Sequence, residues 1–278
     1  RDRVGGATLG GFNPGYIPES ELALHDRLSD EQKAKQLGFD DHPVFTYRVA
    51  EILKEPTNKV WGFPYADLVM GCHMANPTNV FRAMATGDPY QIKALFVLGN
   101  NTLLSYANQH QILKALNNQE LIVAHEIFMT PTAMLADYVL PGDVFTERNH
   151  IADSWSWTNR LTLSQKAVEP PVQASSTFEF WTDLGRRMGF AEHFPWDSLE
   201  DLLDHRLSRS NRTFAQFEQT SYMEAPTPKF RKYRKTGFAT PSGKVELYSS
   251  ILADLNFDPL PYYREGPSPD QPYPYRVF

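Results

Sequence analysis

Short apolar runs alternate with segments of helical pattern between residues 68 and 140 of this 278-residue chain. The runs are predicted as strands, and they cover residues 68–72, 93–98, 121–124 and 138–140. The segments between them are predicted as helices, and they cover residues 77–85, 103–118 and 131–136. Continuous apolar strands that alternate with helices are typical of a parallel sheet with helices on both faces. The expected fold class is therefore α/β, a doubly wound, mostly parallel, Rossmann-like sheet with an additional helical segment.

Apolar side chains at helical spacing define the buried faces expected for two helices. In residues 42–54 the face consists of Phe45, Val49, Ile52 and Leu53. In residues 103–118 it consists of Tyr106, His110, Leu113 and Leu116. Because proline removes an N–H donor and clashes with the preceding turn, Pro56 is expected to end the first of these helices.

The character of the sequence changes after about residue 170, where capping residues predict three further helices. Ser176 with Glu179 forms a capping box. The helix it opens is expected to bury Phe178, Trp181, Leu184 and Met188 and to end at Gly189. Asp197 with Glu200 is predicted to begin the second helix, and Asn211 to cap a third that holds Phe214 and Phe217. No strand partner for this helical block is evident in the sequence.

Composition and pattern divide the chain into four parts. Residues 1–40, rich in Gly, Pro and charge, are interpreted as an irregular segment from a neighbouring domain. Residues 41–170 form the Rossmann-like domain, and residues 171–235 form the helical segment. Residues 236–278 are interpreted as the lead-in and linker to a missing C-terminal domain. Both ends are expected to be cut, because the chain lacks an initial Met and residues 273–278 resemble the start of a strand.

Charge and motif content exclude several classes of function. The formal net charge of −6 argues against a nucleic-acid partner. No apolar run approaches the roughly 20 residues that cross a bilayer. The single cysteine, Cys72, excludes an internal disulfide and a cysteine cluster for zinc or iron–sulfur, and it is expected to be a buried apolar residue. Nucleotide-binding GxGxxG and P-loop motifs and the GxSxG elbow are missing, so we expect no catalytic residue and no metal ligand here.

Candidate binding residues follow the strands, because ligands of doubly wound sheets bind beyond the carboxyl ends of the strands. Gly99, Asn100 and Asn101 follow the second predicted strand. His125 and Glu126 follow the third, and Glu126 offers a carboxylate to the neighbouring N–H groups of a guanine. Arg148 lies beyond the fourth strand, and its planar fork suits a phosphate.

Each candidate also has a structural interpretation. Asn100 and Asn101 are residues that turns tolerate in left-handed backbone. His125 and Glu126 also fit a solvated strand end. Arg148 beside Glu147 fits a surface ion pair of small energy. Their joint position at strand ends favours the binding interpretation.

Three motifs resemble those of molybdopterin oxidoreductases of the dimethyl sulfoxide reductase and formate dehydrogenase family. The first is residues 92–106, with Thr102 where proline is common. The second is residues 122–133 followed by 136–141, in which Glu126 replaces a more frequent Asp. The third is residues 238–248, which resemble the lead-in to the C-terminal barrel of the family. The resemblance covers nearly the whole chain, and residues 153–160 depart from the usual Asn-x-Glu-Gly-Arg-x-Gln segment.

The resemblance implies a molybdenum bis(molybdopterin guanine dinucleotide) cofactor. Asn101 would then contact the cofactor, His125 and Glu126 would hold one guanosine, and Arg148 would lie near its phosphates or base. Thr177 stands where members often have an Asp that contacts the guanine. The expected cofactor-binding set is therefore Gly99, Asn100, Asn101, His125, Glu126, Arg148 and Thr177.

The resemblance also implies what this chain lacks. The molybdenum ligand and any iron–sulfur cluster would belong to an upstream part of the parent enzyme, so the isolated chain is expected to be inactive. Its implied partners are the remaining domains of the parent enzyme and electron-transfer subunits. The implied process is anaerobic respiration. The resemblance leaves the compartment open between the bacterial cytoplasm and the periplasm. The main alternative is a free-standing Rossmann-like nucleotide-binding or regulatory module, and a second is a helical and α/β interaction scaffold without a ligand.

Overall fold

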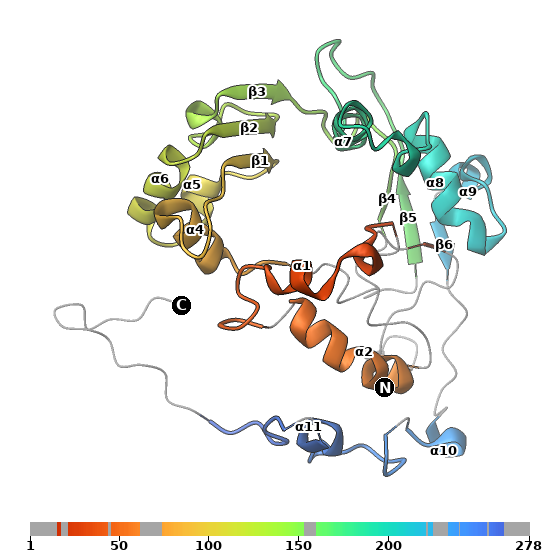
Figure 1. Cartoon of the computed structure of the whole chain (residues 1–278). Coiled ribbons are helices and arrows are strands. Elements are labelled where there is room, and N and C mark those ends of the chain that lie inside the picture. Colours follow the sequence, from red (N-terminus) through yellow and green to blue (C-terminus); the bar gives the residue numbers. More distant parts are fainter. Residues whose placement is uncertain are drawn as a thin grey trace.

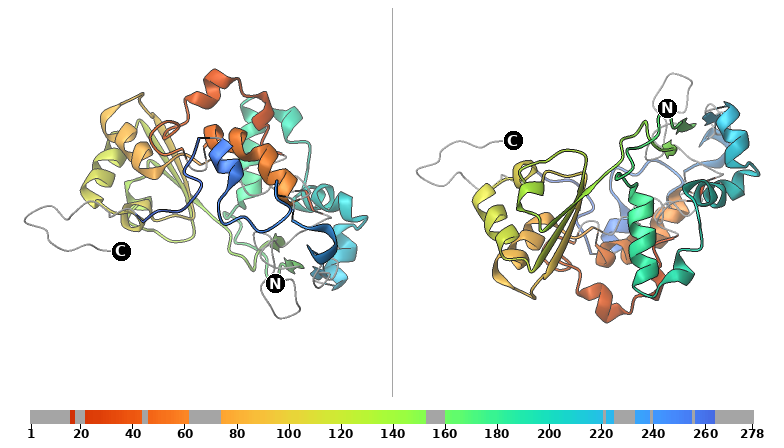
Figure 2. Two further views of the ribbon diagram at one scale, coloured as in Figure 1. Left: turned by 90° about the horizontal axis from the view of Figure 1, so that it is seen from below. Right: turned by 90° about the horizontal axis from the view of Figure 1, so that it is seen from above.

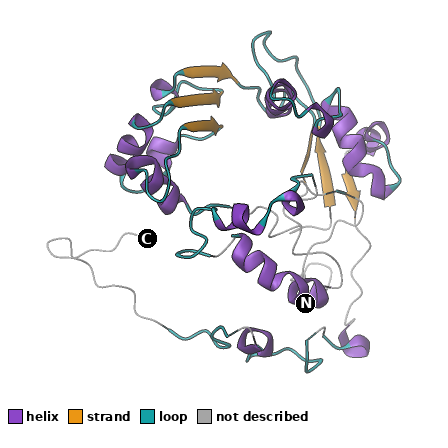
Figure 3. Cartoon of the chain, viewed as in Figure 1, coloured by secondary structure: helices purple, strands orange, loops and turns teal. Residues whose placement is uncertain are grey.

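The computed structural model describes residues 16–17, 22–43, 46–61, 74–152, 160–220, 222–224, 233–238, 240–254 and 256–263. Figure 1 shows two sheets on opposite sides of the molecule, with helix α7 at the top and helices α1 and α2 below. One sheet contains β1, β2 and β3, and the other contains β4, β5 and β6 (Figure 3). We call the parts built around them the parallel lobe (residues 77–141) and the antiparallel lobe (residues 150–152, 160–164 and 199–224).

The parallel lobe confirms the predicted α/β fold class. Its strands are β1 (Ala94–Leu98), β2 (Leu121–Glu126) and β3 (Tyr138–Pro141), and they pair in parallel in the order β1-β2-β3. Helices α4 (Pro77–Thr86) and α6 (Gln109–Asn117) lie over one face of this sheet (Figure 2). The core between sheet and helices contains Met84, Val97, Ile112, Leu116 and Ile122, each less than 9% exposed. The strand predicted at residues 68–72, including Cys72, lies outside the described residues.

Local signals explain the bounds of α4. The side chain of Asn76 accepts a hydrogen bond from the N–H of Thr78 at 2.9 Å, and Pro77 occupies the first turn, where its missing N–H costs nothing. Gly87 ends the helix in left-handed backbone (φ 78°), which glycine adopts without a steric penalty. The sequence therefore predicted this helix to within one residue.

The helix predicted at residues 103–118 is two helices. Helix α5 (Thr102–Ser105) ends at Tyr106, whose backbone is extended, and α6 begins after Asn108. Asn108 is in left-handed backbone (φ 60°), and its side chain accepts a hydrogen bond from the N–H of Gln111, which starts a new helix. The buried face of α6 is Ile112, Ala115 and Leu116, so the predicted face was right for Leu116 and wrong for Tyr106, His110 and Leu113, which are exposed.

Helices precede the parallel lobe as well. Within the segment predicted as irregular, η2 (His25–Arg27) and α1 (Asp30–Ala34) form, the latter with a capping box on Ser29. Helix α2 spans Tyr47–Trp61, so the prediction that Pro56 ends it was wrong. A proline inside a helix removes only one N–H donor, and the rest of this helix continues around that loss. Phe45, predicted on its apolar face, lies outside the described residues.

The helical block does have strand partners, contrary to the sequence prediction. Strands β4 (His150–Ala152), β5 (Arg160–Ser164) and β6 (Tyr222–Glu224) form an antiparallel sheet. Helices α8 (Leu199–Leu207) and α9 (Phe214–Thr220) contribute to the same core, which contains Ile151, Leu161, Leu207 and Phe217. This sheet joins strands from both sides of the boundary proposed at residue 170, and that domain division stays a prediction.

Two of the three caps differ from the predicted ones. Ser198, not Asp197, caps α8, and its partner in the capping box is Asp201. Thr213 and Gln216 exchange side-chain hydrogen bonds at the start of α9, at 3.1 and 3.2 Å. Asn211 instead ends the short helix η6 (Ser208–Ser210) in left-handed backbone.

The remaining short helices are η3 (Ala133–Leu135), η5 (Ala191–His193), α10 (Tyr233–Thr236) and α11 (Ser250–Asp254). Among the described helices, none has the length and apolar character needed to span a membrane.

Helix α7 (Thr177–Arg187) links the lobes. The predicted capping box is confirmed, since Ser176 and Glu179 exchange hydrogen bonds at 2.6 and 3.1 Å. Its Trp181 ring lies 5.8 Å from that of Phe96, which alternation along β1 places on the sheet face opposite α4 and α6. The predicted apolar face was wrong for Trp181 and Met188, which are 40% and 63% exposed. Thr182 and Gly185 are buried instead.

Gly185 offers a test of this packing. A Cβ there would lie 2.2 Å from Cε2 of Phe194, whose carbonyl accepts two hydrogen bonds from Arg186. Helix propensity alone would make Gly185→Ala stabilising by about 1 kcal/mol. We expect overpacking to outweigh this gain and to lower the free energy of unfolding by about 1–2 kcal/mol, measured by urea denaturation. Asp183→Ala, exposed on the same helix, should change it by less than about 0.5 kcal/mol. A stabilised Gly185→Ala chain would contradict the packing.

Candidate cofactor-binding site

The loop after β1 is tied to the segment after β2. Gly99 is in left-handed backbone (φ 57°), and its N–H donates to the carbonyl of His125 at 3.0 Å. The Oδ1 atom of Asn101 accepts from the hydroxyl of Thr132 at 2.9 Å, and that hydroxyl accepts from the N–H of Leu103. The Oδ1 atom of Asn100 accepts from the hydroxyl of Thr102. Gly99, and neither of the two asparagines, has the left-handed backbone that the structural interpretation proposed for them. Within the described part of the chain, neither asparagine uses its side-chain N–H₂ group.

His125 and Glu126 end β2 and have different environments. His125 is 5% exposed, its Nε2 lies 2.8 Å from the carbonyl oxygen of Ser175, and its ring lies 5.7 Å from that of Phe180. Glu126 is partly exposed and accepts through Oε1 from the N–H of Ile127 at 2.9 Å. Among the described residues, its Oε2 atom has no hydrogen-bond partner. His125 therefore connects the sheet to the start of α7, and Glu126 retains an acceptor for a ligand.

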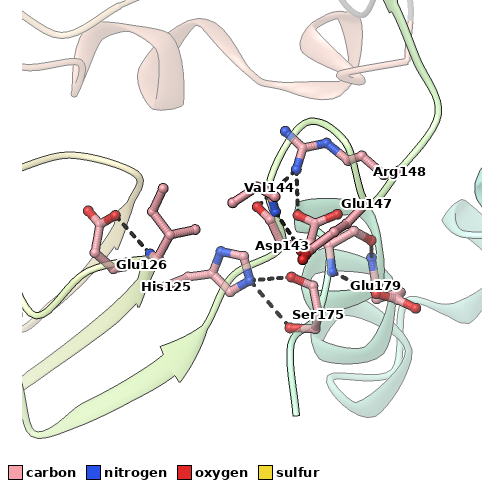
Figure 4. A network of polar contacts seen from close by, with 10 residues as sticks. His125, Glu126, Asp143, Val144, Glu147, Arg148, Ser175 and Glu179 are labelled. Atoms are coloured by element: carbon pink, nitrogen blue, oxygen red, sulfur yellow. Dashed lines mark hydrogen bonds and ion pairs between the residues drawn. The ribbon is translucent and has the colours of Figure 1, made fainter. Parts of the chain in front are cut away.

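Arg148 does not pair with its neighbour Glu147, so that structural interpretation was wrong. Its Nη1 atom donates to both the main-chain carbonyl and the carboxylate of Asp143 (Figure 4). Glu147 accepts from the N–H of Val144 at 2.9 Å. Burial raises the pKa of the Asp143 carboxyl above its ordinary value of 3.8, although Arg148 acts in the opposite direction. The sequence singled out Arg148 but missed Asp143, because ion pairs have no periodic signal.

Two pockets share Arg148. The larger, about 490 Å³, is also lined by Thr177, Arg206 and the aromatic side chains of Tyr16, Phe178, Trp181, Phe194 and Trp196. Among its described lining residues there is no Asp or Glu. The smaller, about 250 Å³, is lined by five acidic residues against Arg148 and Lys166: Asp143, Glu147, Glu179, Asp197 and Glu200. The larger pocket suits an anion or an aromatic ring, whereas the smaller repels anions.

The predicted residues therefore form two groups. Gly99, Asn101 and Glu126 lie at the carboxyl edge of the parallel sheet, whereas Arg148 and Thr177 line the larger pocket. Figure 4 places Glu126 and Arg148 on opposite sides of His125. No group of three or more His, Cys, Asp or Glu side chains in the described residues is arranged to hold a metal.

Residues 46–187 match the family model of molybdopterin oxidoreductases, which is about half of the chain and includes all the candidate residues. The chain belongs to this family. It is 42% identical over 261 residues to acetylene hydratase of Syntrophotalea acetylenica. It is 24% identical over 202 residues to the molybdopterin-containing subunit of thiosulfate reductase of Salmonella typhimurium. The solved structure of acetylene hydratase from Pelobacter acetylenicus superimposes with a TM-score of 0.81 at 42% identity over 93% of this chain.

The match covers part of each relative. It spans 36% of the Syntrophotalea acetylene hydratase, 27% of the thiosulfate reductase subunit and 35% of the solved hydratase chain. This chain therefore corresponds to about a third of a molybdopterin enzyme, and as a family member it is part of an enzyme.

The pair of Asp143 and Arg148 makes a first prediction about the site. The Asp143 side chain is 4% exposed and that of Arg148 is 32% exposed. Arg148→Met would leave a buried carboxylate without its cation, and we expect the free energy of unfolding at pH 7 to fall by about 3 kcal/mol. Adding Asp143→Asn should recover most of this loss. Urea denaturation of the two single variants and the double variant measures the coupling, and additive losses would contradict it.

The raised pKa of Asp143 predicts a pH dependence. As pH falls from neutral, the folded chain binds a proton at Asp143 before the unfolded chain does, because the folded pKa lies above 3.8. The contribution of this group to stability therefore decreases as pH rises through the window between 3.8 and the raised pKa. Asp143→Asn should remove this component. As pH rises across the window, the unfolding free energy of the unchanged chain should therefore fall relative to that of the variant. A difference that is constant with pH would contradict it.

Proposed function

We propose that this chain binds the guanosine end of a molybdopterin guanine dinucleotide at the carboxyl edge of the parallel sheet. The observation that carries the proposal is the Glu126 carboxylate, which ends β2 with one oxygen unused among the described residues. Guanine presents two neighbouring N–H donors, and one carboxylate accepts both. The family membership supports a molybdenum–pterin cofactor. The guanine dinucleotide form is the proposed part.

The residues at this edge fit such a group. The amide N–H₂ groups of Asn100 and Asn101 have no partner among the described residues, lie in the loop beside β2, and match ribose hydroxyls or phosphate oxygens as donors. A Cβ at Gly99 would meet no atom within 4 Å, so the backbone there leaves room for a ligand. His125, whose Nε2 is bonded to Ser175, is proposed to position this edge through packing instead of holding the guanosine directly.

Binding and orientation are the whole of the role proposed for this chain. The molybdenum–pterin group supplies the bond-making chemistry when bound, and the protein supplies position and electrostatics. We therefore propose that the isolated chain has no turnover. The remaining domains of the enzyme are its proposed partners, and they hold the metal ligand and any iron–sulfur cluster.

For the whole enzyme, the similarity favours hydration over net oxidation or reduction. Identity to acetylene hydratase is 42% over 94% of the chain, against 24% over 64% for the thiosulfate reductase subunit. Adding water to a carbon–carbon triple bond gives an enol and then a carbonyl compound, with no net gain or loss of electrons. An enzyme of this kind needs no electron-transfer subunit as a partner. Acetylene consumption by the whole enzyme, without an added electron donor or acceptor, tests this proposal.

A guanine nucleotide titration tests the proposed binding. We expect the 278-residue chain to bind guanosine 5′-monophosphate more tightly than adenosine 5′-monophosphate in calorimetry, because adenine lacks the N–H pair that Glu126 accepts. Glu126→Gln should weaken binding of the guanine nucleotide about 10- to 100-fold, since bonds to a charged acceptor contribute about 1.5–3 kcal/mol.

Glu120 provides a matched control. It precedes β2 at the opposite edge of the sheet, 67% exposed and paired with Lys93 at 3.0 Å. Glu120→Gln should bind both nucleotides like the unchanged chain. Equal affinities for the two nucleotides in all variants would refute the proposal. A free-standing nucleotide-binding module is the rival, and coding sequence for a cysteine cluster upstream in the same reading frame would exclude it.

A further inference from the structure

Arg148 lies at the wall between two pockets of opposite charge. The larger pocket contains Arg148, Arg206 and the first turn of α7, and its described lining has no carboxylate. The smaller pocket contains five carboxylates. The first turn of α7 also borders the larger pocket through Thr177 and Phe178, but Glu179 in that turn offsets the positive end of the helix, so the favourable charge comes from Arg148 and Arg206. An anion that reaches Arg148 is therefore favoured on the side of the larger pocket.

Asp143 fixes the direction of Arg148. Both hydrogen bonds between them use Nη1 of the arginine, so among the described residues Nη2 and Nε have no hydrogen-bond partner and can donate to other acceptors. The backbone of Asp143 is itself held, because its N–H donates to the carbonyl of Ser175 at 3.2 Å and Gly142 bridges Ser175 in parallel. Burying a carboxylate at this point costs free energy, which a purely structural ion pair recovers poorly. The buried carboxylate instead keeps the guanidinium of Arg148 rigid and in one orientation.

We infer that Asp143 is a positioning residue, which holds the free N–H groups of Arg148 at the wall of the larger pocket to receive a phosphate group of the bound nucleotide. The inference rests on the function proposed above. It adds that the base and the phosphate of the nucleotide are recognised at different places. Glu126 selects the base, and the pair of Asp143 and Arg148 selects the phosphate. A guanidinium held in one orientation loses less entropy when it binds a phosphate than a mobile one.

The ratio of affinities for guanosine 5′-monophosphate and guanosine measures this role. Asp143→Asn keeps the size of the side chain and an acceptor but removes the charge that orients the arginine. We expect it to weaken binding of the monophosphate about tenfold and to leave guanosine unchanged, because only the phosphate contact depends on the orientation. Arg148→Gln should lose the preference for the monophosphate. Calorimetry on the 278-residue chain and its variants gives both affinities, with circular dichroism to verify folding.

Asp197→Asn is the matched control, since Asp197 lines the smaller pocket and its side chain is 91% exposed beside Arg186. It should keep the ratio of the unchanged chain. Equal weakening of both ligands by Asp143→Asn would assign a merely structural role to Asp143 and overturn the inference. An unchanged ratio in Asp143→Asn would also overturn it. If the unchanged chain binds neither ligand, the proposed function itself fails, and the inference fails with it.

Discussion

Parallel pairing of β1, β2 and β3 determines where every polar loop of this region can lie. Leu98 pairs with His125, and Glu126 pairs with Pro141, so the three strands end on neighbouring rungs. The pairing continues beyond the strands, because the N–H of Gly99 donates to His125 and the N–H of Gly142 donates to Glu126. Backbone groups fixed in this way cannot shift without breaking several hydrogen bonds. Loops that are distant in the sequence therefore open on one edge, and a nucleotide site there needs only the side chains at the turns.

The parts of the fold that local chemistry determines were predictable. Asn76 and Pro77 mark the start of α4, and Ser176 with Glu179 marks the start of α7, because capping satisfies N–H groups within one helical turn. The three described strands of the parallel lobe are continuous apolar runs, a pattern expected of strands covered by other elements. The candidate residues at the sheet edge followed from the same reasoning, since parallel strands place their carboxyl ends together. Thr132, which connects the two loops, was within a recognised motif but was not singled out.

Features that depend on contacts between distant residues were not predictable. Strand β6 is only three residues long and pairs with β5 across the whole helical block, so no local pattern marks it. The choice of Ser198 over Asp197 as a cap depends on which backbone angle the incoming chain adopts. The burial of Gly185 follows from the position of Phe194. The pairing of Arg148 with Asp143 is local, with the two residues five positions apart, but it was not predicted because no spacing rule marks an ion pair within a turn.

The two lobes also differ in how they relate to known enzymes. The family model ends at residue 187, within α7, whereas the similarity to acetylene hydratase extends over 94% of the chain. Helices α8 and α9 of the antiparallel lobe, which contribute Leu203, Leu207, Phe214 and Phe217 to its core, therefore lie beyond the family region, whereas β4 and β5 lie within it. That lobe contributes Ile151, Leu203 and Arg206 to the larger pocket, and the segment before α8 contributes Phe194 and Trp196. The proposed guanosine edge therefore lies within the region that the family model matches, whereas part of the wall of the larger pocket lies beyond that region.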